Sequence, residues 1–190
     1  MNPDDSFAQA RAYALRGWFV LPLWWPISTG ECACGLPDCD SPGKHPIRRL
    51  VPHGLHHASH RPEQVEEWWR LCPHANVGVR TGAASGILVL DVDGEAGRLA
   101  LRGLVAHHGL FDTRWARTGS GWHAYFAHPG GTVPNSAGRL GAGLDIRADG
   151  GYVVAPPSLH ASGSRYRWID NLNDEVSAPL DRTLPQCRAG

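Results

Sequence analysis

The sequence lacks the features that would place the chain in or across a membrane. No run approaches the roughly 18 consecutive apolar residues of a transmembrane helix, and the N-terminus has no basic region followed by an apolar one, the pattern of a secretory signal. Internal repeats and low-complexity tracts are also missing. We therefore expect a globular cytoplasmic protein that has no membrane partner.

An excess of charge of either sign is missing as well. The chain has 18 basic and 18 acidic residues, so it lacks the polycationic character with which some proteins hold nucleic acid mainly through their electric field. Any contact with nucleic acid must therefore be local. With 190 residues, 42% of them hydrophobic, the chain can build a sizeable core. We expect one domain over residues 1–170 and a weakly patterned, linker-like tail over 171–190.

Residue patterns predict a mixed α+β fold. Helices are expected over 6–17, with Ser6 as the cap, over 62–72 and over 95–108, where apolar residues recur at helical spacing. Short β-branched or aromatic runs between turn residues predict strands, and Asp149-Gly150 predicts a tight hairpin turn between the last two. The predicted strands cover 18–21, 76–80, 87–90, 115–117, 123–126, 144–147 and 152–155.

One of these strands ends in a pair of carboxylates. Residues 87–90 form a short aliphatic run, typical of a strand that is buried on both faces. Because side chains alternate along a strand, Asp91 and Asp93 project from one face while Val92 points into the core. Two acids this close repel each other unless cations lie between them or one stays protonated, and Mg²⁺ and Mn²⁺ prefer carboxylate oxygens. The pair indicates a divalent-metal site, although Asp-x-Asp-Gly is also a common way to open a loop.

A second candidate metal site lies in residues 26–60, which are rich in Pro, Gly, Cys and His and too long for a structureless loop in a compact domain. Three thiols and an imidazole form a complete tetrahedral ligand set for structural zinc, and zinc would supply the free energy that orders this loop. These ligands are Cys32, Cys34, Cys39 and His45. Two alternatives stay open: free buried thiols, or a partial site completed by His53, His56 or His57.

A glycine-rich segment, 118–123, leads into a strand that begins with a histidine. Its glycines and the Ser120 hydroxyl allow a close approach to phosphate oxygens, and His123 can donate to the same oxygens. An ordinary turn followed by a structural histidine fits the pattern too. Asp145, on a later strand, either completes a triad with Asp91 and Asp93 or is an edge charge that prevents aggregation.

Taken in order, these segments resemble the three motifs of the archaeo-eukaryotic primase superfamily: a hydrophobic strand ending Asp-x-Asp, a small residue two before a strand histidine, and a hydrophobic residue followed by Asp. More narrowly, the chain resembles the N-terminal primase-polymerase (Prim-Pol) domain of bifunctional replication proteins from plasmids, phages and integrative elements. Gly121 stands where this family usually has serine. The matching stretches cover most of residues 7–170 and are GWFVLPL (17–23), SPGKHP (41–46), NVGVRTG (76–82), SGILVLDVDG (85–94), RTGSGWHAYF (117–126) and GLDIRADGGYVVAPPS (143–158).

The resemblance implies a core of two parts, an α/β half related to the RNA-recognition fold and a second mixed β half. The active site would lie in the cleft between them, with the zinc loop inserted. Asp91, Asp93 and Asp145 would hold two Mg²⁺ or Mn²⁺ ions, one activating a primer 3′-hydroxyl and the other neutralising the leaving pyrophosphate.

The resemblance also implies nucleotide contacts. His123, helped by Ser120 and Gly121, would bind the triphosphate of the incoming nucleotide. Further phosphate contacts are expected from basic side chains in the matching stretches, since a triphosphate needs point or forked positive charge. These candidates are Lys44, Arg80, Arg117 and Arg147.

We therefore expect a monomeric, template-directed nucleotidyltransferase that binds DNA and extends primers with dNTP or NTP, working with a helicase as a fused domain or a partner. Nucleotide preference and initiation of chains de novo stay open. One alternative is a non-catalytic nucleic-acid-binding module of a replication initiator, which would use the zinc loop and the basic, His-rich segment 44–61. Clustered acids argue against that alternative. A two-metal nuclease is the other.

Overall fold

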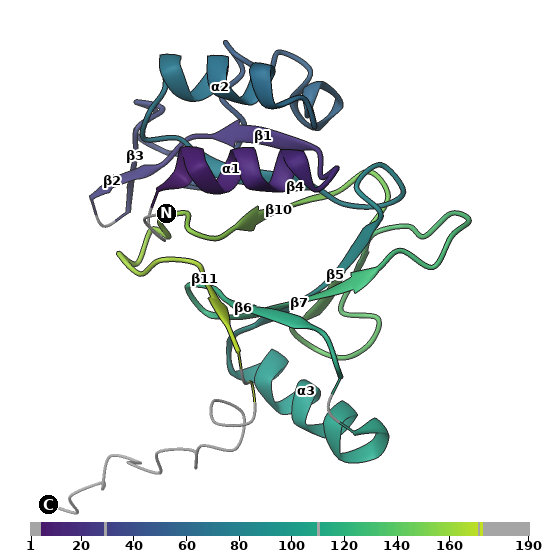
Figure 1. The fold of residues 1–190 in the computed structure, drawn as a ribbon. Coiled ribbons are helices and arrows are strands. Elements are labelled where there is room, and N and C mark those ends of the chain that lie inside the picture. The colour runs from purple at the N-terminus through teal and green to yellow at the C-terminus, as the bar shows by residue number, and fades with distance from the viewer. Residues whose placement is uncertain (1–4, 29, 110, 171, 173–190) are drawn as a thin grey trace, which may run out of the picture.

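The computed structural model describes residues 5–28, 30–109, 111–170 and 172. It confirms a mixed α+β fold, with three α-helices, one 3₁₀ helix and several sheets among these residues. Figure 1 shows α1 and α2 beside a small sheet at one end of the molecule and α3 against a larger sheet at the other. The predicted tail, 171–190, lies outside the described residues apart from Leu172.

The helices lie where the sequence predicts them. Helix α1 spans Ser6–Leu15, α2 spans Pro62–Leu71 and α3 spans Gly94–His108. The expectation that Ser6 caps α1 was wrong, because the Asp5 carboxylate, one residue earlier, accepts the N–H of Ala8 at 3.0 Å. Pro62 lies in the first turn of α2, where its missing N–H costs no hydrogen bond.

The strands form three antiparallel sheets. A three-stranded sheet has the order β1-β4-β10, with β1 over Val20–Leu23, β4 over Asn76–Arg80 and β10 over Tyr152–Ala155. A six-stranded sheet has the order β11-β6-β7-β5-β9-β8. Its strands are β5 (Ile87–Asp93), β6 (Arg114–Arg117), β7 (Gly121–Ala127), β8 (Ser136–Ala137), β9 (Leu144–Arg147) and β11 (Arg167–Ile169). A two-stranded ribbon, β2 (Pro26–Ser28) with β3 (Glu31–Cys32), begins the Cys-rich loop.

The predicted hairpin at Asp149-Gly150 was wrong. Strand β9 pairs with β5 and β8 in the six-stranded sheet, whereas β10 pairs with β4 in the three-stranded sheet. Gly150 does have the positive φ of a tight turn, 78°. The turn does not close a hairpin, because the Asp149 carboxylate accepts the N–H groups of Ala83 and Val133, each at 2.8 Å, and so ties the turn to two other segments. The segment after β9 therefore crosses from one sheet to the other.

Strand β1 is shifted by two residues from its predicted range. It contains Pro22, which is tolerated because β1 lies at the edge of its sheet. Strand β5 is central in the larger sheet and runs three residues beyond its predicted end, through both acids. Ile87 and Val89 pack into one core cluster, and Leu90 and Val92 pack into another that includes Leu101 of α3. Both faces of β5 therefore pack against apolar clusters before the acids begin.

Candidate active site

A row of functional side chains crosses the middle of the six-stranded sheet. Asp91 on β5 lies directly opposite His123 on β7 and opposite Asp145 on β9. Residues that oppose each other in antiparallel strands project from the same face, and Asp93, two residues on, shares that face. The structure thus brings together the three acids and the histidine that the sequence singles out.

The row borders a hollow of about 400 Å³, whose walls come from both sheets and from the loop that follows the cysteines. A volume of this size suits a nucleotide-sized ligand. The lining includes Lys44, Leu55, Asp91, Asp93, Thr118, Ser120, His123, Asn135, Arg147, Tyr152 and Tyr166. We call this space the central hollow.

Arg147 lies between two of the acids. Its guanidinium is 2.9 Å from the Asp145 carboxylate and 3.7 Å from that of Asp91, and it is partly exposed, with 40% of its side chain accessible. Asp145 also accepts the N–H of Gly138 at 3.0 Å and lies beside the central hollow, outside its lining. The acids thus gather a cation on the face where the sequence predicts metal ions.

His123 is the second partner of Asp91. The residue is 5% exposed, and its Nε2 lies 3.3 Å from an Asp91 carboxylate oxygen. Burial by itself raises the pKa of Asp91, but the hydrogen bond and charge of His123 and the charges of Arg147 and Lys44 outweigh it, so the pKa falls below its usual value. Asp91 is therefore ionised at neutral pH. The buried Nδ1 of His123 has no hydrogen-bond partner among the described residues.

Ser120 and Gly121, which follow each other in the glycine-rich segment at the start of β7, have different surroundings. The Ser120 hydroxyl lines the central hollow and donates to the Asp93 carboxylate. The N–H of Gly121 instead donates within the loop to the Thr118 hydroxyl at 2.9 Å. A Cβ on Gly121 would lie 1.9 Å from the carbonyl oxygen of Val92, so glycine is needed here because β5 and β7 approach closely.

The four basic candidates divide into two pairs. Lys44 and Arg147 line the central hollow. Arg117 lies opposite Trp122, so the two side chains project from the same face of the sheet. Trp122 packs into the core cluster beside α3, and this face is the one opposite to the face of His123. Arg80 ends β4 opposite Tyr152 and lies outside the lining of the hollow. The structure thus brings Lys44 and Arg147 to the acids and leaves Arg80 and Arg117 apart from them.

Several lining residues were missed from the sequence. Tyr152 follows two glycines in the stretch 143–158, and the match of that stretch to the family is the signal that could have found it. Tyr166, Asn135 and Leu55 lie outside the sequence motifs described above. Burial, together with the charges of Asp91 and Asp93, raises the pKa of Tyr166, so its phenol keeps its proton and can donate a hydrogen bond into the hollow.

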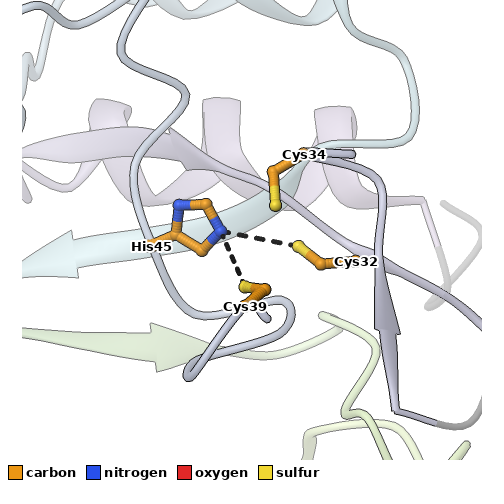
Figure 2. A group of neighbouring side chains, drawn as sticks. All are labelled: Cys32, Cys34, Cys39 and His45. Carbon is orange, nitrogen blue, oxygen red and sulfur yellow. Dashed lines mark hydrogen bonds between the residues drawn. The ribbon is translucent and has the colours of Figure 1, made fainter. Parts of the chain in front are cut away.

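The Cys-rich loop brings its four predicted ligands to one point. Figure 2 shows the side chains of Cys32, Cys34, Cys39 and His45 turned toward each other. Their ligand atoms all lie within 4.8 Å of one another, and the His45 Nε2 is 3.5 Å from the sulfur of Cys32 and 3.4 Å from that of Cys39. Tetrahedral zinc, with bonds of about 2.3 Å to sulfur and about 2.0 Å to nitrogen, places such ligands about 3.5 Å apart. The geometry fits zinc.

Protonation also favours a metal at this point. Burial lowers the pKa of His45, and the nearby charge of Arg48 lowers it further against the opposing effect of Asp40. The ring is therefore neutral at pH 7, which is the form that binds metal. His53, His56 and His57, the alternative ligands considered from the sequence, are not part of the group.

The chain matches one known family over most of its length. Residues 10–183 match the family described as bifunctional DNA primase/polymerase, N-terminal (Prim-Pol). The chain belongs to this family, as the three motifs predicted, and is thereby a domain of the DNA primase/polymerase type. No curated protein matches it. None of the described helices is long and apolar enough to span a membrane.

Proposed function

We propose that the chain is a template-directed nucleotidyltransferase that extends DNA primers in the central hollow. The observation that carries the proposal is the row of Asp145, Asp91 and His123 across three neighbouring strands, with Asp93 on the same face. Lys44 and Arg147 add positive charge beside these acids. A hollow that combines acids with cations on its walls suits a nucleotide triphosphate accompanied by divalent metal.

Asp91, Asp93 and Asp145 are the residues that would hold two Mg²⁺ or Mn²⁺ ions. Their fit is supported by Arg147, a cation already attracted to two of these carboxylates. When bound, the ions supply activation of the primer 3′-hydroxyl and neutralise charge on the leaving pyrophosphate. Displacement of the Arg147 guanidinium from the acids would free it to pair with a phosphate, for which its forked donors are suited.

The residues around the acids have complementary tasks in this proposal. His123 and the Ser120 hydroxyl line the hollow next to the acids, and Lys44 adds an ammonium group from the loop that is bonded to Tyr152 of the other sheet. Together they would orient the triphosphate for in-line attack. The family resemblance adds the setting, which is replication of a plasmid, phage or integrative element with a helicase as a fused domain or partner; we propose in addition a monomeric protein in the cytoplasm. It also supports a core whose two halves meet at the hollow.

Primer extension tests the proposal. The wild type is given a labelled primer on a DNA template with dNTPs or NTPs and with Mg²⁺ or Mn²⁺, and is compared with the Asp91→Asn plus Asp93→Asn variant. We expect metal-dependent extension that falls by on the order of 10²-fold or more in the variant, because the charge that binds the metal is lost. The matched control, Glu66→Gln plus Asp112→Asn, removes two exposed acids that lie outside the central hollow and should extend primers normally.

Other outcomes would identify the alternatives. Metal-dependent shortening of the labelled DNA without extension would contradict the proposal in favour of a two-metal nuclease. Absence of any reaction by folded wild-type protein with either metal, together with retained DNA binding, would contradict it in favour of a binding module.

A further inference from the structure

The segment 41–62 is basic although the whole chain is neutral. It contains Lys44, Arg48, Arg49 and Arg61, no acidic residue, and the histidines 45, 53, 56, 57 and 60 out of the 11 in the chain. Arg48 and Arg61 are exposed and have no ion pair with any described residue. Positive charge is therefore concentrated, unneutralised, on the loop that forms one wall of the central hollow.

Two more hollows continue from the central one along this segment. The second, of about 380 Å³, shares Leu55 and Tyr152 with the central hollow and is also lined by Arg48 and His53. The third, of about 330 Å³, shares His56 with the second and is lined further by Arg61. The shared lining residues place the three hollows side by side in a series that starts at the acids, and we call the second and third hollows the basic groove.

Tyr152 stands at the junction of the central hollow and the basic groove. Its hydroxyl donates to the carbonyl oxygen of Lys44 at 2.9 Å, which fixes the orientation of the ring. A fixed aromatic ring between two nucleotide-sized spaces is suited to stacking a base, and arginines spaced along the groove are suited to successive phosphates. Each space has the size of a single nucleotide.

We propose that the basic groove binds the unpaired template strand of DNA as it approaches the catalytic acids. The identity of the occupant rests on the proposed function, since a polymerase holds its primer as a duplex and its upcoming template as a single strand. Phosphates of that strand pair with Arg48 and Arg61, while Tyr152 and Leu55 separate the base in the central hollow from the next one. The acids of the central hollow repel DNA phosphates, so the groove supplies the attraction that holds the template there.

The test is equilibrium binding of fluorescently labelled DNA, followed by anisotropy at several salt concentrations, without nucleotide or divalent ions. Two ligands are compared: a blunt duplex, and the same duplex with a 5′ template overhang of several nucleotides. The variant Arg48→Ala plus Arg61→Ala is measured against a matched control, Arg11→Ala plus Arg16→Ala, which removes two exposed arginines of α1 and its C-cap. Circular dichroism and zinc content establish that each variant is folded.

We expect the wild type to prefer the overhang ligand and the groove variant to lose about tenfold or more of its affinity for that ligand alone. Removing two phosphate contacts to a single strand should reduce the slope of log K against log salt by about 1.4. The control should match the wild type. Equal losses for the blunt and overhang ligands, or no loss for either, would overturn the inference.

The acid variant, Asp91→Asn plus Asp93→Asn, keeps this result separate from the proposed function. It should bind the overhang ligand at least as tightly as the wild type, because it removes negative charge near DNA while leaving the groove intact. Groove-dependent binding by a wild type that extends no primer would refute the polymerase proposal and leave a single-strand site. If the groove variant extends primers as well as the wild type at limiting template, the groove proposal is refuted and the polymerase proposal stands.

Discussion

Ser120 and Gly121 are adjacent residues whose roles the family motif alone does not separate, since Gly121 occupies the position of the usual serine. The structure separates them by their surroundings. Gly121 uses its N–H inside the loop and lies against the backbone of β5, so its role is to let β5 and β7 pair closely. Ser120 presents its hydroxyl to the central hollow, so its role concerns the ligand.

Substitutions at the two positions should therefore have different effects, one on stability and the other on nucleotide binding. Gly121→Ala should lower the melting temperature by several degrees, because its Cβ would overlap the Val92 carbonyl and force β5 and β7 apart. Ser120→Ala should keep the wild-type melting temperature and weaken nucleotide binding by a few fold, as expected for one lost hydrogen bond. Thermal unfolding and titration with a fluorescent nucleotide measure the two effects. A stable Gly121→Ala protein with selectively weakened nucleotide binding would contradict this division.

At the scale of elements, the Cys-rich loop connects the Cys/His cluster to the central hollow through two consecutive residues. His45 belongs to the cluster that fits zinc, and Lys44 lines the hollow. The same stretch is held to β4 and to the residue that follows β1. The carbonyl oxygen of Gly43 accepts from the Asn76 side chain at 2.9 Å, and that of His45 accepts the N–H of Trp24 at 2.9 Å. Zinc would therefore order the loop and, through it, the position of the Lys44 ammonium.

Removal of zinc should consequently affect both stability and nucleotide affinity. We expect Cys39→Ser, or treatment with a zinc chelator, to lower the melting temperature and to weaken triphosphate binding, because residues 26–60 lose their cross-link. Metal analysis, thermal unfolding and nucleotide titration measure the three quantities. Cys72→Ser is the control, since Cys72 lies outside the cluster, and it should keep full zinc content. Absence of zinc from protein purified without chelators would contradict the prediction.

Elements fixed by local residue patterns were predictable, and those fixed by long-range pairing were not. Helix α2 begins at Pro62 and ends before Pro73, and both signals are local. The turn at Asp149 and Gly150 carries an equally strong local signal, yet it joins two sheets because Asp149 bonds to Ala83 and Val133. No rule of spacing reveals those partners.

The same distinction applies to the site. Strand alternation and motif order restrict the candidates enough to name Asp91, Asp93, Asp145 and His123. The four residues of the Cys/His cluster lie close together in the sequence. Tyr166 and Leu55 reach the central hollow only through the packing of distant segments. Arg117 illustrates the converse: it is six residues from His123 in a matching stretch, but strand alternation turns it to the opposite face.

For the whole molecule, the central consequence is that one ligand would contact both sheets. Asp91 and His123 belong to the six-stranded sheet, Tyr152 to the three-stranded sheet, and Lys44 to the loop bonded to it. A nucleotide held by residues from each part stabilises their arrangement as well as its own site. Binding to the folded state alone raises the free energy of unfolding by about 2.7 kcal/mol when the ligand is present at 100 times its Kd.

We therefore expect a nucleoside triphosphate with Mn²⁺ to raise the melting temperature of the wild type by about 5–10 °C, the shift that this free energy produces in a domain of this size. Lys44→Ala should lose most of the shift, since it removes an ammonium group that lines the central hollow. Arg139→Ala, which removes an exposed charge outside the hollow, should keep it. Differential scanning fluorimetry measures all three proteins, and a shift that survives in Lys44→Ala would mean that Lys44 does not hold the nucleotide.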